Sequence, residues 1–245
     1  MVQAQAAGPV ISPAGVTNAA TNLAGPVSPG EILVLFGSGL GPATLAVATL
    51  NATGLVDTKS GGTRVFFDGI AAPMIYAVTG QVSAVVPYEV GPNATTAVQV
   101  EYQGQLSSAV SLQTVSAAPG IFTADSSGKG QGAILNQDGF VNGQTNPAAK
   151  GSVISVFATG EGILSPAGVN GKLASTPVPA PILPVQAILN GATVTPLYAG
   201  SAPSLVEGVL QVNLQIPGDA SAGPLSLVVK IGSAVSQPGI TVSVK

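Results

Sequence analysis

The sequence of 245 residues contains no cysteine, no histidine and no tryptophan. Without cysteine there is no disulfide, no thiol nucleophile and no thiolate metal site. The absence of histidine removes the commonest general base and the commonest nitrogen ligand of metal ions. No serine stands in the G-x-S-x-G motif of hydrolases either. We therefore expect a non-enzymatic protein with no catalytic, metal-binding or cofactor-binding residue.

Charged residues are also scarce, at 7% of the chain, against roughly 25% in ordinary globular domains. Seven basic and ten acidic residues give a net charge of −3, and no basic cluster is present that would attract a nucleic acid. A surface with few charges repels other copies of itself weakly. No apolar run approaches the roughly 18 residues of a membrane-spanning helix.

The residues that are abundant favour an all-β protein. The chain has 32 glycines, 20 prolines and 46% hydrophobic residues, so it can fill a core between many turns. Val98, Val100 and Tyr102 alternate with polar residues, which indicates a strand with one buried face. No stretch of ten residues shows a clean helical period with a cap. Short strands separated by glycine and proline turns predict β-sandwiches.

One segment occurs twice. Residues 65–87, VFFDGIAAPMIYAVTGQVSAVVP, have the same order of features as residues 187–217, which begin AILNGATVTPLYAG and end QVNLQIP. Phe36 and Phe157 correspond in the apolar run that precedes each copy. The sequence therefore predicts two tandem immunoglobulin-like β-sandwich domains related by an internal duplication.

Each copy carries a turn signal between two apolar runs. Asp68 and Gly69 form it in the first copy, and Asn190 and Gly191 in the second. Asp-Gly and Asn-Gly pairs favour two-residue hairpin turns with positive φ. Because Asp is replaced by Asn between the copies, we interpret these four residues as structural and not as a calcium or acid site.

The predicted division of the chain has three parts. The turn-forming sequence Ala117-Ala-Pro-Gly120 marks the boundary between the two repeats. The parts are a flexible leader or extended arm (1–12), the first sandwich (13–117) and the second sandwich (118–245).

Two pairs of side chains are candidates for a functional site. Glu161 and Glu207 lie in predicted loops of the second domain, and we interpret them as solvated loop acids and not as a glycosidase pair. Tyr88 and Tyr102 have no counterpart in the other repeat. If exposed, they are the candidates for stacking on a sugar, in a chain that lacks tryptophan.

Several motifs together resemble a known family. PVSPGEILVLFGSGLGP, VFFDGIAAPMIYA, QVSAVVP and PGIF occur in this order, followed in the second half by FATGEG, YAGSAP and QVNLQIP. This order, over residues 10–244, is similar to the uncharacterised C-terminal region of large secreted bacterial proteins of the Solibacter, or acidobacterial, type. The resemblance implies tandem immunoglobulin-like (IPT/TIG-like) sandwiches on exported proteins, and it implies no catalytic residue.

The expected function is that of an extracellular structural or adhesive module at the bacterial cell surface. We expect it to associate with itself or with surface proteins, as in a filament built by strand addition, with residues 1–12 or 240–244 as the donor strand. The alternatives are a carbohydrate-binding accessory domain and an inert spacer between domains. The N-terminal MVQAQAAGPV lacks a basic segment followed by a long apolar one, so we expect no intact signal peptide in this sequence.

Overall fold

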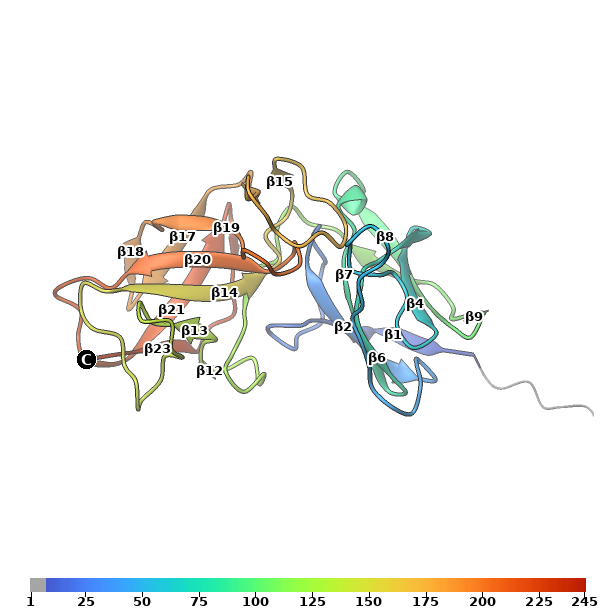
Figure 1. Cartoon of the computed structure of the whole chain (residues 1–245), viewed down its shortest axis with the longest axis horizontal. Helices are drawn as coiled ribbons and strands as arrows, with labels where there is room; N and C mark the ends of the chain where they lie inside the picture. Colours follow the sequence, from blue (N-terminus) through green and yellow to red (C-terminus); the bar gives the residue numbers. More distant parts are fainter. Residues whose placement is uncertain (1–7) are drawn as a thin grey trace, which may run out of the picture.

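The computed structural model describes residues 8–245 and is all-β, with two sandwiches side by side along the longest axis (Figure 1). Residues 1–7 of the predicted arm lie outside the described residues. Among the described residues, the one helical turn is the 3₁₀ segment η1 (Tyr88–Val90) in the first sandwich. In residues 8–245 no helix has the length and apolar character needed to cross a membrane.

The first sandwich contains ten strands. They are β1 (Val10–Asn18), β2 (Ile32–Ser38), β3 (Ala46–Val47), β4 (Thr63–Phe67), β5 (Ile70–Ala71), β6 (Met74–Val78), β7 (Gln81–Val85), β8 (Thr95–Tyr102), β9 (Gln105–Leu106) and β10 (Val110–Gln113). One sheet has the order β1-β2-β7-β6-β3 and the other β10-β8-β4-β5, with β9 paired to β8. Their facing side chains form one core, in which Leu33 and Leu35 of the first sheet meet Val65 and Phe67 of the second.

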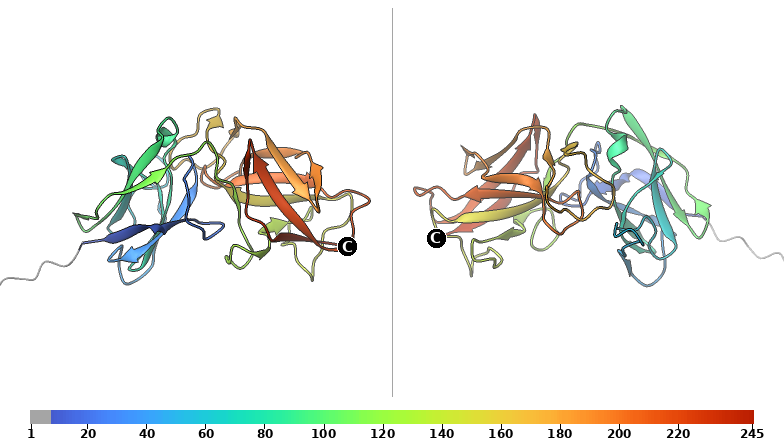
Figure 2. Two further views of the ribbon diagram at one scale, coloured as in Figure 1. Left: turned by 180° about the vertical axis from the view of Figure 1, so that it is seen from behind. Right: turned by 45° about the horizontal axis from the view of Figure 1, so that its top comes forward.

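The second sandwich repeats this arrangement with additional short strands. They are β11 (Gly120–Ile121), β12 (Gly130–Gln131), β13 (Ile134–Leu135), β14 (Val153–Thr159), β15 (Leu164–Ser165), β16 (Ala180–Pro181), β17 (Val185–Leu189), β18 (Ala192–Val194), β19 (Tyr198–Ser201), β20 (Leu210–Gln215), β21 (Gly223–Ile231), β22 (Ala234–Val235) and β23 (Ile240–Val244). Its sheets have the orders β11-β14-β20-β19 and β12-β23-β21-β17-β18. Figure 2 shows both sandwiches from two further directions.

The two sandwiches pair their strands in the same register. Phe36 in β2 lies opposite Gln81 in β7, and Phe157 in β14 lies opposite Gln211 in β20. In both sandwiches a long strand then pairs with a hairpin, β8 with β4-β5 and β21 with β17-β18. This is the arrangement that the sequence repeat predicts, while the duplication as an evolutionary event stays a prediction.

The repeated turns adopt the backbone that their sequence favours. Asp68 and Gly69 have φ of 51° and 80°, and Asn190 and Gly191 have φ of 48° and 84°. Two successive residues with positive φ are the mark of a type I′ hairpin turn, whose twist matches that of the strands. The Asp68 carboxylate also accepts the N–H of Ala97 at 2.8 Å, which ties the turn to β8.

Two details differ from the predicted organisation. Strand β1 begins at Val10 and pairs with Ser38 of β2, so residues 10–12 belong to the first sandwich and not to a leader. Strand β23 is hydrogen-bonded to β21 on one side and to β12 on the other. The expectation that residues 240–244 form a donor strand is therefore wrong, because both edges of that strand are already paired.

Candidate functional site at the joint between the sandwiches

The most distinctive region is the contact between the two sandwiches, which we call the joint. It is formed by residues 18–32 and 85–91 of the first sandwich and residues 116–122, 159–173 and 202–209 of the second. The N–H of Ile32 donates to the Thr159 hydroxyl oxygen at 2.8 Å, and that hydroxyl donates to the carbonyl of Gly208 at 2.7 Å. One side chain therefore links three segments of the chain.

An apolar cluster fills the middle of the joint. Ile32, Val56 and Val85 from the first sandwich pack against Val206 from the second, with Phe122 and Leu173 among the partly buried residues around them. Apolar area removed from water contributes roughly 25 cal/mol per Å², so this contact favours a fixed arrangement of the sandwiches.

The connection between β14 and β17 reaches across to the first sandwich. In Figure 1 the segment around β15 lies above the gap between the two halves. The carbonyl of Gly171 accepts the N–H of Val56 at 2.7 Å. The Asn170 side chain accepts the N–H of Tyr88 at 3.1 Å and donates to the Glu89 carboxylate at 2.8 Å. These contacts add a second attachment to the one made by Thr159.

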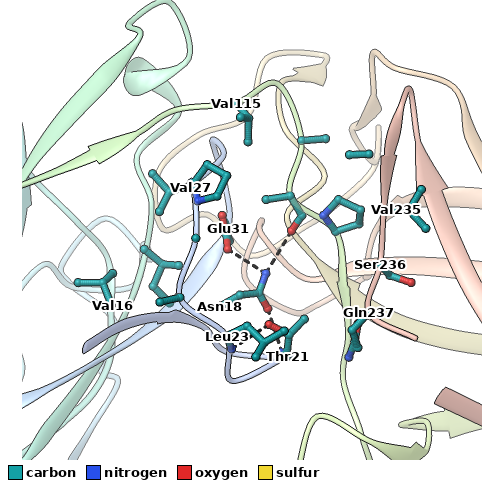
Figure 3. Close-up of a pocket in the computed structure, with 18 of the residues that line it drawn as sticks. Val16, Asn18, Thr21, Leu23, Val27, Glu31, Val115, Val235, Ser236 and Gln237 are labelled. Carbon is teal, nitrogen blue, oxygen red and sulfur yellow. Dashed lines mark hydrogen bonds between the residues drawn. The ribbon is translucent and has the colours of Figure 1, made fainter. Parts of the chain in front are cut away.

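A cleft of about 390 Å³ opens on one face of the joint and is lined by residues from both sandwiches. Figure 3 shows Asn18 and Glu31 in this cleft, with Gln237 of the second sandwich across from them. The Asn18 amide donates to the Glu31 carboxylate at 2.8 Å and to the carbonyl of Ala118 at 3.1 Å. Asn18 therefore connects the end of β1 to the linker between the sandwiches.

Glu31 is a buried acid at the start of β2. One carboxylate oxygen accepts the Asn18 amide, and the other accepts the N–H of Ser28 at 2.8 Å. Burial raises the pKa of Glu31 to about 8, although these hydrogen bonds favour the charged form and oppose the rise. The sequence analysis missed Glu31, although an isolated acid directly before the apolar run ILVLF was a usable signal.

Glu161 and Glu207 are also buried in the joint, with exposed fractions of 0% and 1%. The expectation that they are solvated loop acids is therefore wrong, because their loops fold against the first sandwich. Neither oxygen of Glu161 has a hydrogen-bond partner among the described residues. Glu207 accepts the N–H of Val169 at 2.7 Å and lies 3.6 Å from the Lys172 ammonium.

Glu161 and Glu207 differ in the charges that surround them. Burial raises the pKa of Glu161 to about 8, and the negative charge of Glu207 adds to the rise, while nearby backbone N–H groups oppose it. Glu207 instead has a cation beside it, since Lys172 forms the one ion pair found within residues 8–245. Across the same residues, no group of three or more His, Cys, Asp or Glu side chains is arranged to hold a metal ion.

Tyr88 is buried in the joint, so the expectation that its ring faces the solvent is wrong. A Cβ atom added at Gly168 would lie 2.5 Å from the ring, and one added at Gly30 would lie 2.9 Å from it. Glycine at both positions therefore lets the backbone approach the two sides of the tyrosine. Its hydroxyl has no partner among the described residues. Burial, with the charges of Glu161 and Glu207, raises the pKa of this phenol above its usual range.

Tyr102 lies elsewhere, at the end of β8, and is half-buried. The Gln103 amide donates to its hydroxyl at 3.2 Å. Tyr88 precedes β8 and Tyr102 is the last residue of that strand. The two tyrosines are therefore separated by the length of the strand, which rises roughly 3.3 Å per residue. The structure does not bring them together into one aromatic surface.

No protein-family model matches the chain, and no characterised protein matches it at a significant level. Among solved structures, it is similar to the Bacteroides ovatus mixed-linkage glucan utilization locus protein SGBP-B in complex with a mixed-linkage heptasaccharide. The identity is 14% over 90% of this chain and 43% of that chain, with a TM-score of 0.30. A chimeric titin Z1Z2-Z1Z2 tandem has 12% identity over 98% of this chain and 97% of that chain, with a TM-score of 0.22.

Proposed function

We propose that this protein is a non-enzymatic structural module, exported to the cell surface, in which two β-sandwiches act as one rigid unit that associates with further copies of itself. The resemblance to secreted bacterial proteins supports the location. Direct hydrogen bonds across the joint, such as Ile32 to Thr159 and Asn18 to Ala118, support rigidity. The low content of charged residues supports self-association.

The observation that carries the association is an apolar surface at one edge of the first sandwich, which we call the β3 edge. Leu45, Val47 and Leu50 lie within six residues of one another and are 58%, 62% and 54% exposed. Strand β3 is the last strand of its five-stranded sheet. Natural proteins usually protect such edges with charges, and contiguous exposed apolar residues mark interaction sites.

Association at the β3 edge uses side chains and not strand addition. The carbonyl of Val47 already accepts the hydroxyl of Ser60 at 3.1 Å, and the strand is only two residues long. We therefore propose an apolar contact between the β3 edges of two copies, whose low charge leaves little repulsion to overcome.

The test is multi-angle light scattering over a concentration series on the wild type and on Val47→Lys. Wild type is expected to gain mass with concentration, while Val47→Lys stays monomeric because the lysine introduces a charge at the contact. Leu106→Lys is the matched control, since Leu106 is 55% exposed but lies on β9, in the other sheet. It should associate as wild type does. A wild-type monomer at every concentration would reject self-association and favour the inert spacer.

Carbohydrate binding remains the alternative, with Tyr102 as the accessible member of the two predicted tyrosines, since Tyr88 is buried. It predicts binding on a glycan array that Tyr102→Ala removes. An array without signal for the wild type would reject it.

A further inference from the structure

Glu161 is held in the joint by its neighbours in the chain. Gly160 and Gly162, on either side of it, have φ of 83° and 80°. A Cβ atom at Gly160 would lie 2.0 Å from the carbonyl oxygen of Ala118, and one at Gly162 would lie 2.0 Å from that of Ser116. The turn is therefore packed directly against the linker between the sandwiches. Glu161 reaches water only if this contact separates.

The groups that face Glu161 come from three other segments. Glu207 stands on the connection between β19 and β20, Tyr88 on η1, and Glu31 at the start of β2. All of them are neutral or negative. The Lys172 ammonium lies 3.6 Å from the Glu207 carboxylate, with which it is paired. Within residues 8–245, no hydrogen-bond donor meets the geometry needed to satisfy either oxygen of Glu161.

The corresponding position of the first sandwich holds an aliphatic side chain. The turn FGSGLGP aligns with FATGEGI through Phe36 and Phe157, so Leu40 corresponds to Glu161. Leu40 is fully buried, and Gly39 before it has a positive φ, as Gly160 does. A carboxyl group therefore stands where the same fold accepts an aliphatic side chain.

We propose that the joint is pH-sensitive: it is closed while the Glu161 carboxyl is neutral, and ionisation of that carboxyl separates the 159–162 turn from the linker and frees the two sandwiches to move. An ionised carboxylate that is buried without a partner costs several kcal/mol. Exposure to water removes this cost, so the charged form favours the open joint. The nearby charge of Glu207 acts in the same direction.

Proton linkage gives the direction in which pH shifts the equilibrium between the closed and the open joint, and the pH range of that shift. The pKa of Glu161 is about 8 in the closed joint, and its ordinary value is 4.5. Between these two pH values the closed form binds the proton and the open form has lost it, so each rise in pH favours opening. The ratio of closed to open molecules falls on the order of 10³-fold between pH 5 and pH 9. Above pH 8 the ratio changes little further.

Ionisation of Glu31 also favours the open joint, but its effect is less specific to the joint than that of Glu161. Its carboxylate accepts hydrogen bonds from Asn18 and Ser28, which stabilise the ionised form in place. For Glu161 only nearby backbone N–H groups act in this way, and neither carboxylate oxygen has a hydrogen-bond partner among the described residues. Glu161 is therefore the residue whose substitution separates a pH-sensitive joint from general alkaline unfolding.

The test uses the absence of native cysteine. Ser108→Cys and Ser221→Cys, both exposed and one in each sandwich, accept a donor and an acceptor dye. We expect the transfer efficiency between them to change as the pH rises from 6 to 9 and to return on acidification, while circular dichroism stays constant. In Glu161→Gln and in Glu161→Leu, the change in efficiency should be much smaller than in wild type, because only the contribution of Glu31 remains.

Asp219→Asn, which removes an exposed carboxylate, is the control and should behave as wild type does. Glu161→Leu guards against a glutamine variant that fails to fold, since leucine occupies the matching position of the first sandwich. A wild-type efficiency that is constant up to pH 9 overturns the proposal. The same pH response in Glu161→Gln or Glu161→Leu as in wild type also overturns it. Both measurements are made in dilute solution, so that transfer between dyes on different copies does not contribute.

Discussion

Thr159 of the second sandwich accepts the N–H of Ile32, the first residue of β2 in the first sandwich, at 2.8 Å across 127 positions of sequence. Both residues are buried, and the same hydroxyl donates to the carbonyl of Gly208 at 2.7 Å. A backbone donor at the start of a strand is thereby satisfied by the other sandwich. The first sandwich cannot separate from the second without leaving the Ile32 N–H to find water.

Replacement of Thr159 by valine should therefore destabilise the protein. Valine keeps the shape but leaves the Ile32 N–H and the Gly208 carbonyl buried without partners, which costs about 1–3 kcal/mol for each group. Urea denaturation followed by circular dichroism measures the change. Thr159→Ser, which keeps the hydroxyl, should stay within about 1.5 kcal/mol of wild type. Equal stability of Thr159→Val and wild type would show that the hydrogen bond is not important.

Stability should decrease as the pH rises from about 4.5 to about 8. Glu31 and Glu161 are the cause, because burial raises the pKa of each from 4.5 to about 8. In that range the folded protein keeps protons that the unfolded chain has released, so the free energy of unfolding falls by up to about 1.4 kcal/mol per pH unit for each acid. Below pH 4.5 and above pH 8 this contribution is constant.

Urea denaturation at a series of pH values tests this dependence. Glu161→Gln should reduce the slope between pH 5 and pH 8 by about half, because one of the two buried acids remains. Asp219→Asn should leave the slope unchanged, since Asp219 is exposed. A free energy of unfolding that rises over this interval would contradict the burial of both acids.

A side chain at the second residue of either hairpin turn should destabilise the protein. Gly69 and Gly191 have φ of 80° and 84°, and nothing lies within 4 Å of a Cβ atom built on either. Alanine there should cost about 1–2 kcal/mol through backbone strain alone. Gly143→Ala is the matched control, because its site is equally open and its φ is not positive. Thermal unfolding of the three variants compares them, and an equal loss in all three would reject the strain.

Local sequence chemistry was sufficient for the strands and turns. Asp68-Gly69 and Asn190-Gly191 predict hairpins because a two-residue turn with positive φ depends on those residues alone. The alternation of Val98 and Val100 with polar residues predicts the buried face of β8, and both valines are fully buried. These are contacts between neighbours in sequence or in one sheet.

The joint could not be predicted in the same way. Glu161 and Tyr88 have the local sequence of exposed loop residues, and only the docking of one sandwich on the other buries them. That docking depends on contacts between distant positions, such as Tyr88 with Asn170. Gly160 and Gly162 were an unused signal of this docking, because they allow close approach of the linker. Glycine is equally common in surface turns, so the sequence alone did not distinguish the two cases.

We expect the two sandwiches to form one rigid body at neutral or lower pH. Backbone ¹⁵N relaxation at pH 6, in dilute solution, measures the rotational correlation time of each sandwich separately. The structure predicts a single correlation time, that of the whole chain, for amides in β2 and β8 and for amides in β14 and β21. Two shorter and different correlation times, one for each sandwich, would contradict the joint described above.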